Sequence, residues 1–209
     1  MWSGLHRTGR GVLRSMTSAP GPYANLPLRK FDVALIDPPW SYFGDQTKDG
    51  AAAKFYGTLT DEEICKLPVR DMLNERAVAF VWATAPRLDA AIDSIRAWGL
   101  HYRGVAFVWV KTNKDGIPIG ARGVRPSIVK PTCEFVLACS TVKKGRPLPI
   151  ADESIRNTVL APTTEHSAKP YVVHERIEAL YPQASRVELF ARQQRKGWYC
   201  WGKQINVNN

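Results

Sequence analysis

The chain has 209 residues, 44% hydrophobic and 23% charged, which is typical of a single globular domain with a sizeable core. Its net charge of +10 favours polyanionic partners such as nucleic acid, although charge alone indicates only non-specific attraction. No apolar run approaches the roughly 18 residues of a membrane span, which argues against a membrane role. The four cysteines form no CxxC pair and no zinc-type cluster with histidine, which predicts reduced thiols and no metal site.

The N-terminal region is basic and contains no acidic residue before position 32. We expect residues 1–30 to be a poorly ordered basic leader, followed by one domain at 31–205 and a tail at 206–209. An organellar transit peptide and a true start at Met16 are two further interpretations of the leader, and both stay open.

The first predicted element is a buried strand at residues 31–36, an apolar run that stops at an Asp-Pro-Pro tripeptide. Residues 41–59 lack periodicity and predict a long loop, and long loops in compact domains tend to be functional. The sequence TDEE at residues 60–63 has the form of a capping box and predicts the start of a short helix.

Strands and helices then alternate along the chain. Pro86 predicts the start of a helix that Gly99 ends, Pro170 predicts the start of another, and 111–130 predicts a long basic loop. Further strands are predicted at residues 77–82, 102–110, 133–139, 186–190 and 198–201. This alternation predicts a three-layer α/β domain with a largely parallel sheet. Ligands of such sheets bind at the carboxyl ends of the strands, and Asp37 lies at one such end.

The tetrapeptide at residues 37–40 has the chemistry to hold an exocyclic amine, whose delocalised lone pair makes it a poor nucleophile. The carboxylate of Asp37 and the carbonyl of Pro38 can accept both N–H groups, and the two consecutive prolines fix the direction of that carbonyl. Trp40 offers a flat face on which an extracted base can stack. The alternative is a rigid turn with Trp40 in the core.

Several segments together resemble the MT-A70 family of adenine-N6 methyltransferases. They are, in the family's order, FDVALIDPPW (31–40), YGTLTDEE (56–63), VAFVWAT (78–84), WVKTN (109–113), KPTCE (130–134), HSAKP (166–170) and VELFAR (187–192). The resemblance implies a Rossmann-like fold in permuted order, with the DPPW catalytic strand first, and S-adenosyl-L-methionine as the cofactor. It also implies that Asp37, Pro38, Pro39 and Trp40 form the catalytic motif.

The resemblance further implies two sets of binding residues. For the cofactor these are Asp37, Lys169 near its carboxylate, Phe190, Arg192, Gln194 and Gln204. For the substrate they are Tyr56, which closes over the adenine, Glu134, which orients the base loop, and the basic residues Lys111, Arg122, Arg125 and Lys130. The alternatives are solvated charges at Lys169 and Glu134. Basic residues at 143–146 and 195–196 are also expected to follow the nucleic-acid backbone.

The chain departs from the pattern of the family's messenger-RNA enzyme near its end. Residues 191–195 read ARQQR, where that enzyme reads Gly-Arg-Pro-His-Asn. Lys203 stands where that enzyme has Asn. No acidic segment for the cofactor's adenine precedes residue 31. Within residues 31–205 no GxG loop cradles phosphates, which suits a cofactor without a pyrophosphate.

The leading hypothesis is methylation of adenine N6 in DNA, because the short build carries no appended RNA-binding module. Methylation of RNA and a non-catalytic nucleic-acid-binding subunit are the alternatives, and the intact DPPW argues against the second. Methylation of a protein amide or a small molecule does not explain the basic loops. Homodimeric and heterodimeric assemblies stay open. A bacterial or phage protein of the cytoplasm is favoured, with an organellar or nuclear location also open.

Overall fold

The computed structural model describes residues 26–41, 59–120, 128–164, 168–202 and 205. Its elements are β1 (Phe31–Ile36), α1 (Asp61–Cys65), α2 (Val69–Met72), β2 (Leu73–Thr84), η2 (Ala85–Arg87), α3 (Leu88–Ala97), β3 (His101–Thr112), β4 (Cys133–Ser140), β5 (Thr158–Pro162), α4 (Val172–Leu180), β6 (Arg186–Leu189) and β7 (Tyr199–Trp201). No helix in these ranges is both long and apolar enough to cross a membrane.

The seven strands form one sheet in the order β5-β3-β4-β2-β1-β6-β7. Among the paired strands, β4 runs antiparallel to β2 and β3, and the other pairings are parallel. The prediction of a largely parallel sheet is therefore confirmed. Because β1 lies between β2 and β6, the chain leaves β1 toward one side of the sheet and returns on the other, which places a topological switch point at the end of β1.

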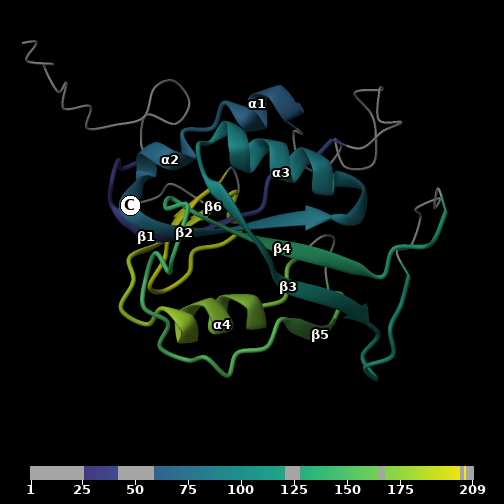
Figure 1. Cartoon of the computed structure of the whole chain (residues 1–209). Helices are drawn as coiled ribbons and strands as arrows, with labels where there is room; N and C mark the ends of the chain where they lie inside the picture. The colour runs from purple at the N-terminus through teal and green to yellow at the C-terminus, as the bar shows by residue number, and fades with distance from the viewer. Residues whose placement is uncertain (1–25, 42–58, 121–127, 165–167, 203–204, 206–209) are drawn as a thin grey trace, which may run out of the picture.

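Helices cover both faces of the sheet, as Figure 1 shows with α1, α2 and α3 on one side and α4 on the other. Alternate residues of β1 separate the two cores, because neighbouring side chains of a strand point to opposite faces. Ala34 and Ile36 belong to the core under α1 and α3, whereas Val33 and Leu35 pack in the core that includes Ile177 of α4. Burial on both faces explains why the strand reads as a continuous apolar run, and the three-layer prediction is confirmed.

The local helix signals are largely confirmed. Thr60 caps α1 with both reciprocal hydrogen bonds of the capping box. Gly99 follows α3 with a φ of +70°, a conformation that glycine adopts without steric cost. Pro86 lies in the single 3-10 turn η2 that precedes α3, so the α-helix itself starts two residues later than predicted.

Several boundaries differ from the prediction, and one strand was missed; β2, for example, starts at Leu73 instead of residue 77. Leu26 is buried in the core, and the backbone N–H of Lys30 donates to the Met72 carbonyl, so the domain includes residues that were assigned to the leader. The strand β5 was not predicted, because it is short, ends in proline and pairs with β3 alone at the edge of the sheet. Residues 1–25 and 206–209 lie outside the described ranges.

Candidate active site

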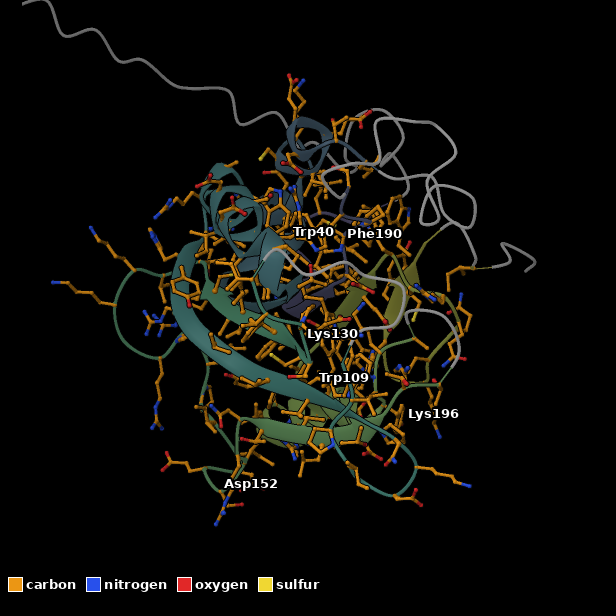
Figure 2. The ribbon with its side chains drawn as sticks, turned by 90° about the vertical axis from the view of Figure 1, so that its right-hand side faces the viewer. Trp40, Trp109, Lys130, Asp152, Phe190 and Lys196 are labelled. Atoms are coloured by element: carbon orange, nitrogen blue, oxygen red, sulfur yellow. The ribbon has the colours of Figure 1, made fainter. Side chains whose placement is uncertain are left out.

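The candidate site lies where β1 ends, in the middle of the sheet. Ile36, the last residue of β1, is paired with Val81 of β2 and Leu189 of β6, and Asp37 follows it directly. Figure 1 shows the carboxyl ends of β2 and β3 on the right-hand side of the molecule, and Figure 2 is turned so that this side faces the viewer. We call this side of the sheet the carboxyl edge.

A tight turn fixes the backbone after Asp37. The N–H of Trp40 donates to the carbonyl of Pro38 at 2.8 Å, which closes a three-residue turn around Pro39. The N–H of Leu59 donates to the carbonyl of Pro39 at 3.3 Å and ties the turn to the residue before α1. A carbonyl oxygen has two lone pairs, so the Pro38 carbonyl keeps one acceptor position for a substrate.

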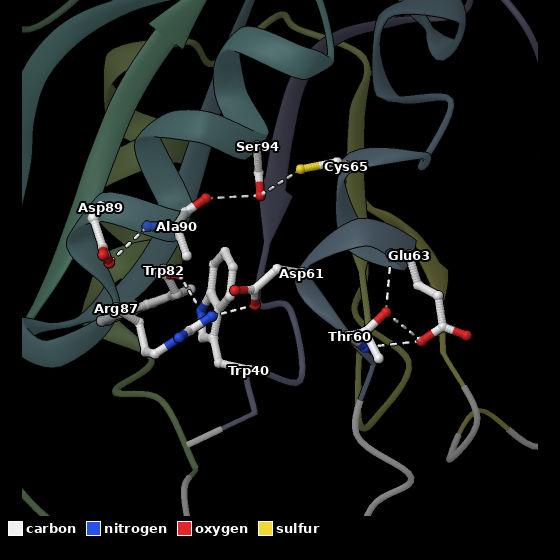
Figure 3. Close-up of polar contacts among 10 residues, drawn as sticks. All are labelled: Trp40, Thr60, Asp61, Glu63, Cys65, Trp82, Arg87, Asp89, Ala90 and Ser94. Carbon is white, nitrogen blue, oxygen red and sulfur yellow. Dashed lines mark hydrogen bonds and ion pairs between the residues drawn. The ribbon is translucent and has the colours of Figure 1, made fainter. Parts of the chain in front are cut away.

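Trp40 is a core residue. Its side chain is 5% exposed, and its indole Nε1 donates to the carbonyl of Trp82 in β2 at 3.0 Å. Figure 3 shows Arg87 beside Trp40, and its guanidinium lies 5.9 Å from the centre of the Trp40 ring. The structure thus supports the core alternative, and the interpretation of Trp40 as an open face for a stacked base is wrong. Packing among apolar side chains and the hydrogen bond to β2 keep the Trp40 ring buried.

Two lysines and two carboxylates alternate across the site. The Nζ atom of Lys169, just before α4, lies 3.0 Å from Oδ1 of Asp37 and 3.4 Å from Oε2 of Glu134. The Nζ atom of Lys111, near the end of β3, lies 2.5 Å from Oε1 of Glu134. We call these four residues the charge cluster. The alternatives of solvated charges at Lys169 and Glu134 are therefore wrong, since their side chains are only 13% and 7% exposed.

The antiparallel direction of β4 explains how Glu134 reaches this edge. As the second residue of β4, Glu134 is paired with Thr84 at the end of β2 and with Trp109 near the end of β3. The start of an antiparallel strand and the ends of its neighbours share one edge of a sheet. Sequence order alone gave no reason to place Glu134 beside Asp37.

Two tryptophans support the charge cluster, and sequence reasoning did not identify either. The Nζ atom of Lys169 lies 5.4 Å from the centre of the Trp82 ring, and that of Lys111 lies 5.2 Å from Trp109. The two indoles meet edge to face at 6.1 Å. Aromatic faces attract cations, so both ammonium groups have partners besides the carboxylates. The Trp residues within VWAT and WVKTN were the signal that could have indicated this.

Burial and the neighbouring charges shift the pKa values of three members of the charge cluster. Burial and the neighbouring Glu134 raise the pKa of Asp37 above its ordinary value, although Lys169 opposes the shift. Burial also works to raise the pKa of Glu134, but Lys169 and Lys111 outweigh it and hold that pKa below its ordinary value. Burial works to lower the pKa of Lys169, but the two carboxylates raise it to about 12. At neutral pH Lys169 is therefore charged.

The residues after β6 lie at the same edge. Phe190 adopts a φ of +63°, which non-glycine residues seldom do, and its ring meets Trp201 edge to face at 5.6 Å. The charge of Arg192 lowers the pKa of both Asp37 and Lys169, which places its guanidinium within electrostatic reach of the charge cluster. Gln194 is exposed.

The predicted basic contacts separate into two places. Lys130 is exposed close to the start of β4, and Figure 2 shows it on the carboxyl edge with Trp40, Trp109 and Phe190. The basic residues at 143–146 follow the other end of β4 and therefore lie at the opposite edge of the sheet, far from Asp37. They were expected to follow the nucleic-acid backbone together with the basic loop at 111–130, and the antiparallel direction of β4 separates them from Lys130. Tyr56, Arg122, Arg125 and Gln204 lie outside the described residues.

Fold and site together define a class. A mixed α/β sheet with helices on both faces and an Asp-Pro-Pro-Trp motif at its switch point is the architecture of a Rossmann-like methyltransferase. The family model described as MT-A70 matches residues 31–204, and the chain belongs to this family. It is therefore a methyltransferase, and the predicted fold class and family are confirmed.

Named relatives agree with this membership. The chain is 31% identical over 205 residues to the type II methyltransferase M.MunI of Mycoplasma sp. This match covers 89% of this chain and 82% of that protein. It is 28% identical over 183 residues to the N(6)-adenosine-methyltransferase catalytic subunit METTL3 of Homo sapiens, covering 86% of this chain and 29% of that protein. A probable N(6)-adenosine-methyltransferase of Oryza sativa is also 28% identical, and this chain spans 24% of its length.

Proposed function

We propose that the protein transfers the methyl group of S-adenosylmethionine to the exocyclic N6 of adenine in DNA. The observation that carries the proposal is Asp37 at the end of β1, with the fixed carbonyl of Pro38 beside it and Lys169 at 3.0 Å. This arrangement provides two acceptors for an amine and one cation for a carboxylate at a single strand end.

The acceptors suit an amine whose lone pair is delocalised into an aromatic ring. One oxygen of Asp37 faces Lys169, and a carboxylate has acceptor positions to spare for an N–H of the base. The Pro38 carbonyl can accept the second N–H, so that the two acceptors favour a pyramidal nitrogen with its lone pair directed away from the ring. After methyl transfer the nitrogen carries an extra proton, which the carboxylate of Asp37 is placed to accept.

The cation suits the cofactor. S-adenosylmethionine supplies a methyl group on a sulfonium and carries a carboxylate and an amine. The ammonium of Lys169 has three donors, of which Asp37 and Glu134 engage two, and the third can donate to the cofactor's carboxylate. Asp37 offers an acceptor to the cofactor's amine. Phe190, Arg192 and Gln194 follow the neighbouring strand and would border the rest of the cofactor.

The choice of DNA rests on the relatives and on charge. The chain covers most of M.MunI, whose designation as a type II enzyme is one used for DNA-modifying methyltransferases. It covers less than a third of the relatives that are named for adenosine N6. The net charge of +10 and the exposed Lys130 at the carboxyl edge favour a phosphate backbone of either kind. RNA is thus the second candidate substrate.

Nucleoside analysis tests the proposal. Purified protein is incubated with isotope-labelled S-adenosylmethionine and either duplex DNA or RNA of matched sequence, and the digested nucleosides are measured by mass spectrometry. We expect labelled N6-methyldeoxyadenosine from DNA, formed at least about a hundredfold more slowly by the Asp37→Asn variant. Label in RNA alone would select the second substrate. Absence of label in both nucleic acids would contradict the proposed enzymatic function.

A further inference from the structure

Arg87 is a buried cation that the proposed chemistry does not use. It ends η2 and is 4% exposed, although it is an arginine at the start of a surface helix. Its Nη2 atom pairs with Oδ1 of Asp61, the first residue of α1, and its guanidinium lies 5.9 Å from the ring centre of Trp40. A buried charge is costly unless it is paired, so its position beside the DPPW motif calls for an explanation.

The contacts of Arg87 lead directly to the carbonyl that is proposed to face the amine. The guanidinium lies against the Trp40 ring, the indole Nε1 donates to the Trp82 carbonyl at 3.0 Å, and the backbone N–H of Trp40 donates to the Pro38 carbonyl at 2.8 Å. Trp40 is therefore held at its ring and at its backbone. A shift of the ring would move the N–H that fixes the Pro38 carbonyl.

The N-terminus of α1 holds Asp61, the partner of Arg87, in place. Asp61 is the first residue of α1, and the capping box of Thr60 and Glu63 fixes the start of that helix, as Figure 3 shows. Leu59, directly before the cap, donates its N–H to the Pro39 carbonyl at 3.3 Å. The start of α1 therefore contacts the DPPW turn twice, once through the Leu59 backbone and once through the Asp61–Arg87 pair.

We propose that Arg87 is a positioning residue for methyl transfer, which acts through Trp40 to hold the Pro38 carbonyl in the direction that the target amine requires. The inference rests on the proposed function, because it assigns that carbonyl to the amine. In this role Arg87 acts through Trp40 and is assigned no contact with substrate or cofactor. Its planar guanidinium can pair with Asp61 and face the indole at once, which the point charge of a lysine does less well.

The inference predicts a loss of turnover without a loss of binding. In Arg87→Met the apolar stem stays and the charge is removed, and we expect kcat at saturating cofactor and DNA to fall by about tenfold to a hundredfold, as small misplacements of reacting groups do. Arg87→Lys should recover part of this loss. The dissociation constant of S-adenosylmethionine should change less than about twofold, because Asp61 and Trp40, which Arg87 contacts, are not members of the charge cluster that faces the cofactor.

The alternative is that Arg87 merely holds α1 against α3. Turnover per folded molecule would then be unchanged in Arg87→Met, whatever happened to the melting temperature. We would therefore measure kcat well below the melting temperature and normalise it to the concentration of cofactor-binding sites. Arg96→Met provides the matched control, because Arg96 belongs to α3 and pairs with Asp93 at the exposed surface. This control should keep wild-type turnover.

A second variant keeps the test decisive if Arg87→Met does not fold. Asp61 is half-exposed, so Asp61→Asn removes the partner of the guanidinium at small cost to the fold, and we expect kcat to fall about threefold to tenfold. The acid limb of the kcat profile should not move in either variant, because the charges that shift the pKa of Asp37 are those of Lys169, Glu134 and Arg192, which both variants keep. Wild-type kcat in Asp61→Asn and in any folded Arg87→Met would overturn the inference and leave the proposed function standing. An inactive wild-type protein would remove both.

Discussion

Each of the two edges of the sheet carries one aspartate: Asp32 lies near the start of β1, and Asp37 directly follows its end. The surroundings of the two carboxylates shift their pKa values in opposite directions. At one edge Asp32 accepts from Asn74 Nδ2 at 2.7 Å and from the backbone N–H and hydroxyl of Ser185 at 3.0 and 2.8 Å. Burial works to raise the pKa of Asp32, but these hydrogen bonds outweigh it and lower that pKa. At the carboxyl edge, burial and Glu134 raise the pKa of Asp37.

This contrast shows what distinguishes a structural carboxylate from a reactive one in this protein. Neutral donors from β2 and from the residue before β6 fix Asp32 in its ionised form and join three segments of the chain. Asp37 has a cation beside it but also a second carboxylate, so its ionised form is less favoured and it can exchange a proton. Because Asp32 lies in β1 and Asp37 directly follows it, the same substitution can compare the two edges directly.

The largest expected effect is on turnover at the carboxyl edge. Asp37→Asn should lower kcat by about two to three orders of magnitude, because a charged acceptor for the amine is lost in a dry site. The fold and most of the cofactor affinity should remain. The rate of methyl transfer, measured in single-turnover experiments with saturating cofactor, tests this expectation. A variant that keeps more than about a tenth of wild-type turnover would refute the assignment.

The next effect is expected at Lys169. Lys169→Met removes the cation that faces Asp37, so the pKa of Asp37 should rise further and the acid limb of the kcat profile should move to higher pH. Affinity for S-adenosylmethionine should fall by about tenfold to a hundredfold, the value of a hydrogen bond to a charged group. Calorimetry and the pH profile measure the two effects. Lys66→Met, at an exposed ion pair of α1, is the matched control and should change neither.

The basic loop that leads to Lys130 and the basic residues of the opposite edge should differ in their contribution to nucleic-acid binding. If Arg122, Arg125 and Lys130 each meet one phosphate, their joint replacement by Ala should reduce the slope of log affinity against log salt by about three on duplex DNA. Sequence preference should change little, since phosphate contacts do not read bases.

The matching variant at the opposite edge replaces Lys143, Lys144 and Arg146, in a loop whose backbone carbonyls accept from the guanidinium of Arg103. Titrations at several salt concentrations should leave its slope at the wild-type value. If the opposite-edge variant reduced the slope and the variant of Arg122, Arg125 and Lys130 kept it, the nucleic acid would bind away from Asp37 and the proposed docking side would be wrong.

The smallest effect is expected for the structural carboxylate. The folded-state pKa of Asp32 is lowered, so its contribution to stability is present above its ordinary pKa and is lost as pH falls through the lowered value. Asp32→Asn should therefore lower the free energy of unfolding by about 1 kcal/mol at neutral pH, since solvent screens this half-buried group. The difference from wild type should vanish in acid. Urea unfolding measures it, and turnover per folded molecule should stay unchanged.

Much of the fold could be predicted from the sequence because its signals are local. The apolar run of β1, the capping box at Thr60 and Gly99 after α3 each act within a few residues, and each is confirmed. The edge strand β5 lacks such a signal, because its pairing with β3 depends on contacts about fifty residues away in the chain.

The site was predictable only in part, for the same reason. Asp37 could be placed at a strand end from its own neighbours, but its pairing with Lys169 joins residues from opposite ends of the domain. The direction of β4 decided that Glu134 belongs to the site and that the basic residues at 143–146 do not. Burial of Trp40 depended on Arg87 and Trp82, which no local pattern connects to it.

The most direct test of the contrast between the two edges is a carboxyl carbon-13 NMR titration of aspartate in the folded wild-type protein. Asp37→Asn and Asp32→Asn identify the two signals. Because the pKa of Asp32 is lowered and that of Asp37 is raised, Asp37 should carry the larger protonated fraction throughout the acid titration. Equal ionisation of the two carboxylates, or a more protonated Asp32, would contradict the account of Asp37 as the reactive carboxylate.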